Sequence, residues 1–157
     1  MDSTHPHATR GRRIDMAGID RSTISLRIFG PDLDPDALTQ RLGGAPTAAA
    51  KTGDTRTNQR GELRVVREGF WRLESGESDA TPLEGKVLDL LGKLTSDVHT
   101  WHDITQHYRT DLFCGLFLSG WNEGFTLTPT VTRLLAERHI RIGFDIYGPV
   151  NTDQDAP

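Results

Sequence analysis

The sequence predicts an α+β sandwich, in which helices pack on one face of a mainly antiparallel sheet. Its strand-like and helix-like segments follow the order strand, helix, strand, strand, helix pair, strand, helix, strand. The first six of these units match the split strand–helix–strand arrangement of ferredoxin-like folds, and a helix and a strand are appended. The 157 residues are enough for one domain with its own hydrophobic core.

The C-terminal half contains the stretch around which the domain is expected to form. Residues 112–118 are almost continuously apolar, as in a central strand that is covered on both faces. Residues 119–124 contain two glycines and an asparagine and predict a turn. Thr128 and Pro129 are typical of a helix start. Residues 140–147 alternate between apolar and other residues, so this strand is expected to bury one face. It could lie parallel to the strand of residues 112–118.

The N-terminal half supplies the remaining strands. Residues 23–29 alternate as a strand with one buried face, and Asp34-Pro35 predicts the start of a short helix. Residues 45–61 are expected to form a long loop that contains at most one edge strand. Residues 63–67 and 70–74 are predicted to form a hairpin across Glu68-Gly69.

Two helices are predicted between this hairpin and the central strand. Thr81 and Glu84 have the spacing of a capping box, so the first helix is expected to begin there. Ser96 is the expected cap of the second helix, on which Trp101 lies within an apolar stripe.

Composition predicts a single cytoplasmic domain with short tails. Residues 1–21 are polar and without periodicity, so a disordered tail is expected, followed by one domain over 22–148 and a flexible tail over 149–157. A single cysteine, Cys114, allows no intrachain disulfide. The sequence shows neither a secretory leader nor a membrane span.

Charge argues against two classes of partner. The chain carries 18 basic and 22 acidic residues, a net charge of -4, which predicts no general attraction to nucleic acid or to membranes. Some ferredoxin-like sheets bind RNA through exposed aromatic residues, but no basic aromatic strand motif is present.

The turn after the central strand is the first candidate site. Trp121, Asn122 and Glu123 offer an aromatic face, an amide and a carboxylate directly after a buried strand. Asp145 on the last strand is expected to approach them if the two strands are neighbours. The competing interpretation is structural, because Asn is favoured in turns and a Trp can cover a sheet edge.

Other candidates have weaker patterns. On the predicted hairpin, Trp71, Arg72 and Glu74 are candidates for lining a groove, although an aromatic residue on a strand is usually part of the core. His99, Asp103 and His107 share one helix face, but that face is opposite the apolar stripe and is expected to be solvated, so no metal site is predicted. Cys114 lies in an apolar run and is expected to be an inert buried thiol. No phosphate-binding loop or nucleophile motif is present, and no cofactor is predicted.

Several motifs resemble a bacterial family known as domain of unknown function 4279. The similarity covers about residues 23–147 and includes Phe70-Trp71-Arg72-Leu73, Gly115-Leu116-Phe117, Asn122-Glu123-Gly124-Phe125 and Phe144-Asp145-Ile146-Tyr147. The resemblance implies no activity, ligand or catalytic residue.

Two functions remain open at this point. The first is a non-catalytic protein-interaction or regulatory module, similar to an immunity protein, because the acidic domain shows no catalytic constellation. The alternative is a small-molecule-binding domain or an enzyme that uses the turn of Trp121, Asn122 and Glu123 with Asp145. Whether the protein is an enzyme is undecided by the sequence, which favours a non-catalytic function.

Overall fold

The computed structural model describes residues 21–76, 81–120 and 122–149. A five-stranded sheet has the strand order β2-β5-β1-β6-β7, and two further strands form a separate small sheet. The elements are β1 (Arg21–Gly30), α1 (Pro35–Leu42), β2 (Ala48–Ala50), β3 (Thr55–Thr57), β4 (Leu63–Val65), β5 (Gly69–Glu74), α2 (Leu83–Gly92), α3 (Val98–His107), β6 (Arg109–Phe117), α4 (Pro129–Glu137) and β7 (Arg141–Tyr147).

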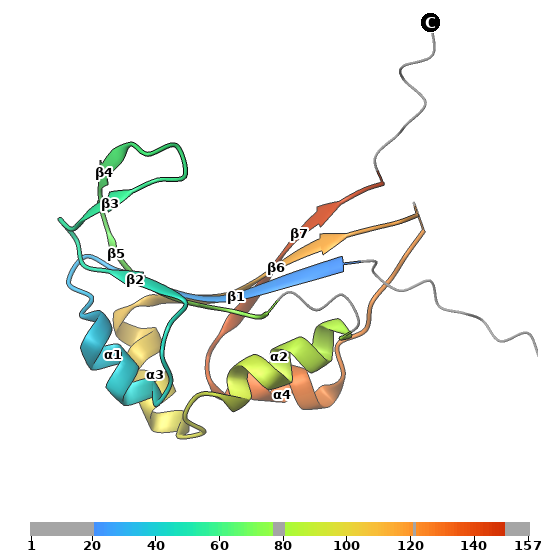
Figure 1. The fold of residues 1–157 in the computed structure, drawn as a ribbon. Helices are drawn as coiled ribbons and strands as arrows, with labels where there is room; N and C mark the ends of the chain where they lie inside the picture. The colour runs from blue at the N-terminus through green and yellow to red at the C-terminus, as the bar shows by residue number, and fades with distance from the viewer. Residues whose placement is uncertain (1–20, 77–80, 121, 150–157) are drawn as a thin grey trace, which may run out of the picture.

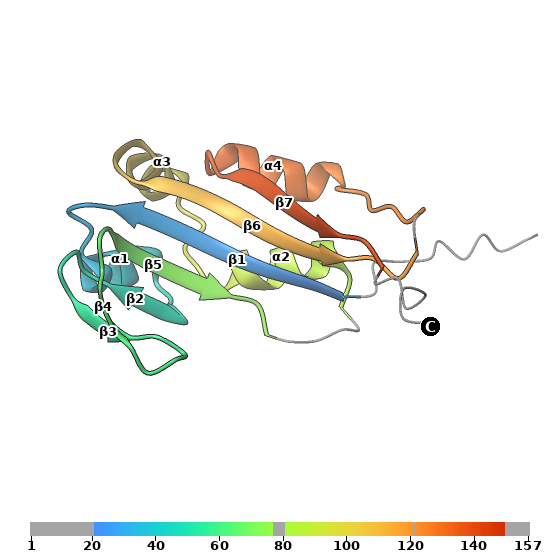
Figure 2. The ribbon, with the colours of Figure 1, turned by 90° about the horizontal axis from the view of Figure 1, so that it is seen from above.

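The main sheet is mixed, and one of its faces carries the helices. β1 is antiparallel to both β5 and β6, β2 is antiparallel to β5, and β6 and β7 are parallel. The helices of the described chain lie on one side of this sheet, whereas the β3–β4 hairpin rises from the other side (Figures 1 and 2). The predicted α+β class is confirmed, and β7 runs parallel to its neighbour as expected.

The core lies between the sheet and the helices. Ile24, Leu26 and Ile28 are buried on β1, in the alternation that the sequence predicts. Two tryptophans, Trp71 on β5 and Trp101 on α3, are fully buried in the same core. Each such side chain contributes about 1.5–3 kcal/mol or more on leaving water, so these alternating positions determine which face of each strand meets the helices.

The predicted hairpin between residues 63–67 and 70–74 is wrong. β4 pairs with β3, and β5 pairs with β1 and β2 instead. The β3–β4 turn is closed locally, because the side-chain oxygen of Asn58 accepts from two backbone N–H groups and Gly61 has a left-handed φ of 76°. The long segment 45–61 therefore contains two short strands rather than at most one.

The helices begin near the predicted positions, but not every predicted capping hydrogen bond is formed. Asp34 caps α1 as predicted, since its carboxylate accepts from the N–H groups of Asp36 and Ala37. The N-cap residue of α2 is Pro82 rather than Thr81, and it makes no side-chain cap hydrogen bond. Glu84 accepts from the backbone N–H of Thr128 instead, which joins the start of α2 to the start of α4.

Similar differences occur at the other two helices. Asp97, rather than Ser96, caps α3, and its carboxylate accepts from the N–H groups of His99 and Thr100. Thr128 and Pro129 begin α4 as predicted, but the Thr128 side chain makes no capping hydrogen bond.

The central strand β6 is covered on one face only. Leu112, Cys114 and Leu116 are buried against the helices, whereas Phe113 and Phe117 alternate with them and are only half-buried. The prediction of a strand covered on both faces is therefore wrong. Ile146 on the edge strand β7 is 55% exposed, so the predicted buried face of that strand is incomplete.

Candidate binding face of the sheet

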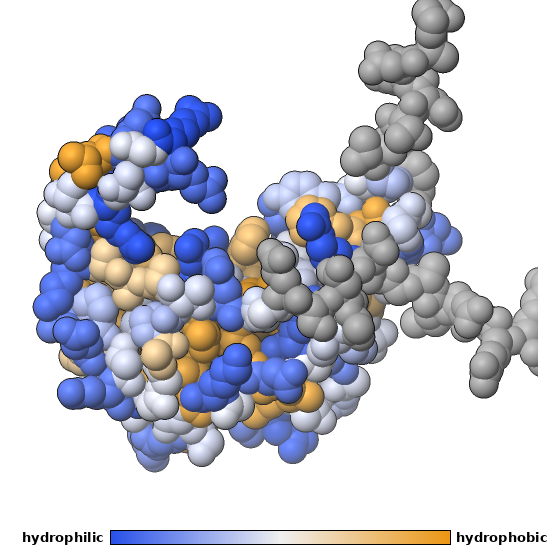
Figure 3. All heavy atoms as spheres, viewed as in Figure 1, coloured by the Kyte–Doolittle hydropathy of each residue, from blue (hydrophilic) through white to orange (hydrophobic). Residues whose placement is uncertain are grey.

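The side of the sheet opposite the helices is a surface that we call the open face. Its residues alternate along the strands with those that enter the core, and strand register places them side by side. The open face consists of Arg21, Thr23, Ser25, Arg27 and Phe29 of β1, Phe70, Arg72 and Glu74 of β5, Arg109, Asp111, Phe113, Gly115 and Phe117 of β6, and Arg141, Gly143, Asp145 and Tyr147 of β7. In Figure 3 a notch separates the β3–β4 hairpin, which rises on this side, from the rest of the molecule.

Arginine side chains lie over the aromatic rings of the open face. Each of its four phenylalanines has a guanidinium carbon within 5.3 Å of the ring centroid, the range of a cation–π contact. The pairs are Arg21 over Phe117 at 4.1 Å, Arg27 over Phe113 at 4.4 Å, Arg109 over Phe29 at 4.9 Å, and Arg56 of β3 over Phe70 at 5.3 Å. The rings of Phe117 and Tyr147 also stack, 4.8 Å apart.

Each carboxylate of the open face already has a partner. Asp111 accepts two hydrogen bonds from Arg27, at 2.7 and 2.9 Å, and side-chain hydrogen bonding to Asp111 is the main reason that the pKa of Arg27 is raised. Glu74 pairs with Arg72 at 3.1 Å. Asp145 accepts from the Tyr147 hydroxyl at 2.6 Å, which raises the pKa of Tyr147.

The open face has more arginines than carboxylates. Five arginines belong to the open face against three acidic residues, although the whole chain has a net charge of -4. Glu68, beside the face, pairs with Arg109 at 3.0 Å. Within the described part of the chain, no carboxylate forms an ion pair with Arg21 or Arg141. The open face therefore has positive charge that remains free to meet an anionic group.

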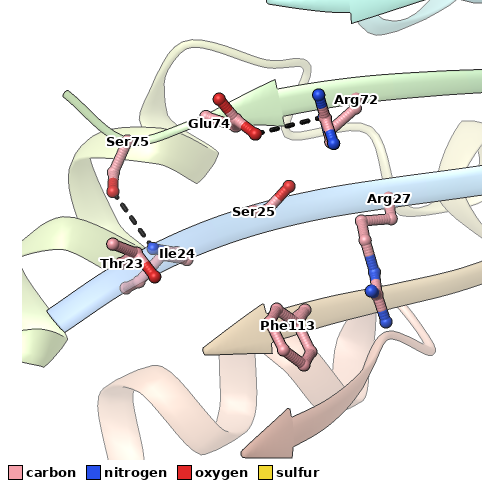
Figure 4. Close-up of a pocket in the computed structure, with 8 residues that line it drawn as sticks. All are labelled: Thr23, Ile24, Ser25, Arg27, Arg72, Glu74, Ser75 and Phe113. Carbon is pink, nitrogen blue, oxygen red and sulfur yellow. Dashed lines mark hydrogen bonds and ion pairs between the residues drawn. The ribbon is translucent and has the colours of Figure 1, made fainter. Parts of the chain in front are cut away.

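A cavity of about 340 Å³ lies near the middle of the open face, and we call it the central hollow (Figure 4). The space exists because the side chains of Thr23 and Ser25 on β1 are shorter than those of Arg27, Arg72 and Phe113 around them. Its lining consists of Thr23, Ile24, Ser25, Arg27, Arg72, Glu74, Ser75 and Phe113. One wall is held in place where Ser75 follows β5: its N–H donates to the Ile24 carbonyl at 2.9 Å, and its hydroxyl accepts from the Ile24 N–H at 3.2 Å.

The Ser25 hydroxyl is the unusual group of the central hollow. Its oxygen is buried and has no hydrogen-bond partner among the described residues. Most buried polar atoms in proteins are hydrogen-bonded, so an unsatisfied oxygen in the lining makes Ser25 a candidate for bonding to a bound group.

The predicted site at the turn is only partly described. Trp121 lies outside the described residues, and Asn122 is exposed. The Glu123 carboxylate accepts from the Ser119 hydroxyl and, at 2.9 Å, from the Ser119 N–H. The hydrogen bond from the Ser119 side chain is the main cause that lowers the pKa of Glu123. These contacts favour the structural interpretation, in which Glu123 closes the turn.

The other two predicted site residues lie on opposite faces of the sheet. Asp145 is on the open face and bonds to Tyr147. Trp71 is 0% exposed in the core, where its indole N–H donates to the Thr39 hydroxyl at 3.1 Å. Trp71 thus offers no surface to a ligand.

Sequence reasoning named Arg72 and Glu74 of the central hollow as candidates for lining a groove, but it did not single out Arg27. Arg27 and Arg72 occupy the polar positions of two alternating strands, and that alternation was the available signal. The positions show which residues face away from the core, but not which strands are neighbours.

Metal and thiol chemistry have little geometric support. Among the described residues, no group of three or more His, Cys, Asp or Glu is arranged to hold a metal ion. Asp103 pairs with Arg41, and the Nδ1 atom of His107 lies 2.8 Å from the Asp103 carbonyl. Burial raises the pKa of the Cys114 thiol to about 12, as expected of an inert thiol.

The fold and this face define an α+β sandwich domain with one helix-covered and one open sheet face. Residues 20–149 match the model of the family described as Domain of unknown function (DUF4279), and the chain belongs to this family. The predicted resemblance is thus confirmed. No curated protein and no solved structure matches the chain significantly. No helix in the described ranges is both long and apolar enough to cross a membrane.

Proposed function

We propose that this protein is a non-catalytic interaction module that binds an acidic protein partner through the open face and regulates it by occupying its surface. The observation that carries the proposal is the set of arginines stacked on aromatic rings across this face. The β3–β4 hairpin reaches Phe70 at one end through Arg56, and the helices of the described chain lie on the opposite face (Figures 1 and 2).

The residue types fit a protein interface. Aromatic residues and arginine are enriched in the centres of protein–protein interfaces, and energetic hot spots are enriched in tyrosine, tryptophan and arginine. An arginine that already lies on a ring loses less side-chain freedom when a partner binds. The edge of its planar guanidinium group still offers N–H donors to a carboxylate.

The charge distribution specifies an acidic partner. Arg21 and Arg141 have no carboxylate partner among the described residues, so an aspartate or glutamate of another protein can pair with them. The rest of the chain carries the excess of acidic residues. An acidic partner would therefore be steered toward the open face and repelled elsewhere.

The contacts favour the open face over the turn that the sequence suggested. The Glu123 carboxylate is bonded to Ser119, and the Asp145 carboxylate is bonded to Tyr147. Both carboxylates therefore have roles within the domain, whereas the guanidinium groups of the open face retain free donors.

The test is a capture experiment with the full chain and matched charge reversals. One variant combines Arg21→Glu with Arg141→Glu on the open face. The control combines Lys93→Glu at the end of α2 with Arg133→Glu on the exposed side of α4, which makes the same change of charge on the helix-covered side of the domain. The immobilised proteins are exposed to extract from the source cells, and the bound proteins are compared by mass spectrometry.

We expect a protein that binds the wild type and the control but not the open-face variant, and whose binding weakens as salt is raised. A partner retained equally by all three proteins would overturn the proposal. So would the absence of any protein above the level of empty beads, or the capture of RNA whose removal by nuclease abolishes binding.

A further inference from the structure

We infer that the central hollow binds a small organic acid with one carboxylate group and a flat apolar body. This inference concerns a free ligand and does not depend on the protein partner. It starts from the pairing of β1 with β5, which places Arg27 directly opposite Arg72 on the open face. Like charges at such a cross-strand pair are unfavourable unless another group compensates them.

Carboxylates of the domain neutralise the two arginines but leave some of the guanidinium N–H donors without a partner among the described residues. Arg27 uses its Nε and Nη2 atoms to hold Asp111, so its Nη1 atom remains available. Arg72 uses its Nε atom toward Glu74, and its two terminal nitrogens bond to no described residue. The Ser25 hydroxyl adds a further donor that has no partner in the described chain. A carboxylate has two oxygens, each with two acceptor positions, so it can accept from more than one of these donors.

Figure 4 shows how these groups surround the space. Arg72 extends from β5 and Arg27 from β1, and the Ser25 hydroxyl points between these two strands. Ser25 lies opposite Glu74 on one side and opposite Phe113 on the other. Arg72 and the Ser25 hydroxyl therefore lie on the β5 side of the central hollow, whereas the Arg27 guanidinium lies on the β6 side, over the Phe113 ring.

The charge of the lining selects a monoanion. Glu74 belongs to the lining, and Asp111 is bound to Arg27, so the two guanidinium groups are nearly neutralised by two carboxylates. A dianion such as a phosphate monoester would meet repulsion from Glu74. A single carboxylate needs the hydrogen-bond donors but little excess charge.

The shape of the cavity requires more than a carboxylate. Its volume of about 340 Å³ falls at the lower end of the range for small-molecule pockets, about 300–1,000 Å³. Phe113 supplies the apolar side chain of its lining, because the Ile24 side chain is buried in the core on the other face of the sheet. The Phe113 ring is held from one side by Arg27 at 4.4 Å, which fixes it as a flat wall for a planar apolar group.

Benzoate is the probe for this site, and benzamide and phenyl phosphate are its controls. Benzamide has the same shape without the charge, and phenyl phosphate replaces the carboxylate with a dianion. Each compound is titrated into the isotopically labelled full-length protein while amide resonances are followed by NMR. The protein variants are Ser25→Ala, Arg72→Gln and the matched control Arg64→Gln, which removes an arginine that is 70% exposed on β4.

We expect benzoate to shift the resonances of residues around the central hollow in a saturable manner at millimolar concentration. Arg72→Gln should weaken binding about tenfold, because a charge-assisted hydrogen bond is lost, and Ser25→Ala about fivefold. Arg64→Gln should bind as the wild type does. Benzamide and phenyl phosphate should each bind about tenfold more weakly than benzoate.

The inference is overturned if benzoate causes no saturable shifts, or if benzamide or phenyl phosphate binds as tightly as benzoate. It is also overturned if Arg64→Gln weakens binding as much as Arg72→Gln. The Arg72 side chain is 44% exposed, so its substitution is not expected to unfold the domain, and thermal denaturation of each variant verifies this. Because no partner is present, these results are independent of the capture experiment.

Discussion

Two glycines on neighbouring strands of the open face should respond in opposite directions to the same substitution. Gly115 is on β6 and Gly143 is on β7. Neither has the left-handed φ that would make a side chain unfavourable. In a strand interior, alanine is more stable than glycine by about 0.5–1 kcal/mol, because glycine loses more backbone freedom on folding. The surroundings of the new methyl group therefore determine the sign of the effect.

The surroundings differ sharply between the two positions. At Gly143 an added Cβ meets no atom within 4 Å, so Gly143→Ala should raise the free energy of unfolding by about 0.5–1 kcal/mol. At Gly115 the added Cβ would lie 2.8 Å from the Oγ1 atom of Thr23. Overpacking of this kind costs about 1–3 kcal/mol, and the β-branched Thr23 has few other rotamers. Gly115→Ala should therefore lower the free energy of unfolding by about 0.5–2 kcal/mol.

A double-mutant cycle isolates the contact. Thr23→Ala removes the oxygen, so Gly115→Ala should become stabilising in that background, with a coupling energy of about 1–3 kcal/mol. Urea denaturation followed by tryptophan fluorescence supplies the free energies. The reasoning is refuted if Gly115→Ala stabilises the wild type as much as Gly143→Ala does, or if the coupling is below about 0.3 kcal/mol.

Three further predictions concern residues whose roles the sequence analysis considered. Trp71→Phe should lower the free energy of unfolding by about 2 kcal/mol in chemical denaturation, through the lost hydrogen bond to Thr39 and the space left by the indole; unchanged stability with altered ligand binding would contradict its core location. The pKa of Glu123 is lower in the folded state, so its contribution to stability is present above the unfolded value of about 4.3 and is lost as pH falls through the folded value. Glu123→Gln should therefore lower the denaturation midpoint at pH 7 and flatten the fall of that midpoint between about pH 5 and 3. A variant with the wild-type pH profile would show that the bonds to Ser119 contribute nothing to stability. Cys114 should resist a disulfide reagent at about pH 8 in the native protein and react after unfolding, because burial raises its pKa to about 12; rapid native labelling, measured by mass spectrometry, would disagree.

Local patterns determined much of the fold. The alternation of Ile24, Leu26 and Ile28 identifies the core face of β1 because side chains on a strand have a period of two. Asp34 and Pro35 mark the start of α1 because the cap and the fixed proline φ depend only on adjacent residues. The same local motifs carry the resemblance to the family that the chain belongs to.

These local patterns did not predict which strands and side chains from distant parts of the chain would pair. β4 was expected to pair with β5, yet it pairs with β3, because a two-residue turn signal competes with any other strand that can supply backbone partners. The cap of α2 failed for a related reason: Glu84 bonds to Thr128, which is distant in sequence and reaches it only in the folded domain.

The binding face depended most on the tertiary structure. From the sequence, Phe113 belonged to a strand buried on both sides and Trp71 was a surface candidate, but an apolar side chain is buried only where another element packs on it. The helices cover the side of Trp71 and leave Phe113 open. Sequence alone therefore determined the fold class, the core face of β1 and the family. Only the packing of helices on one face and the strand register, which places Arg27 opposite Arg72, decided where the proposed binding face lies.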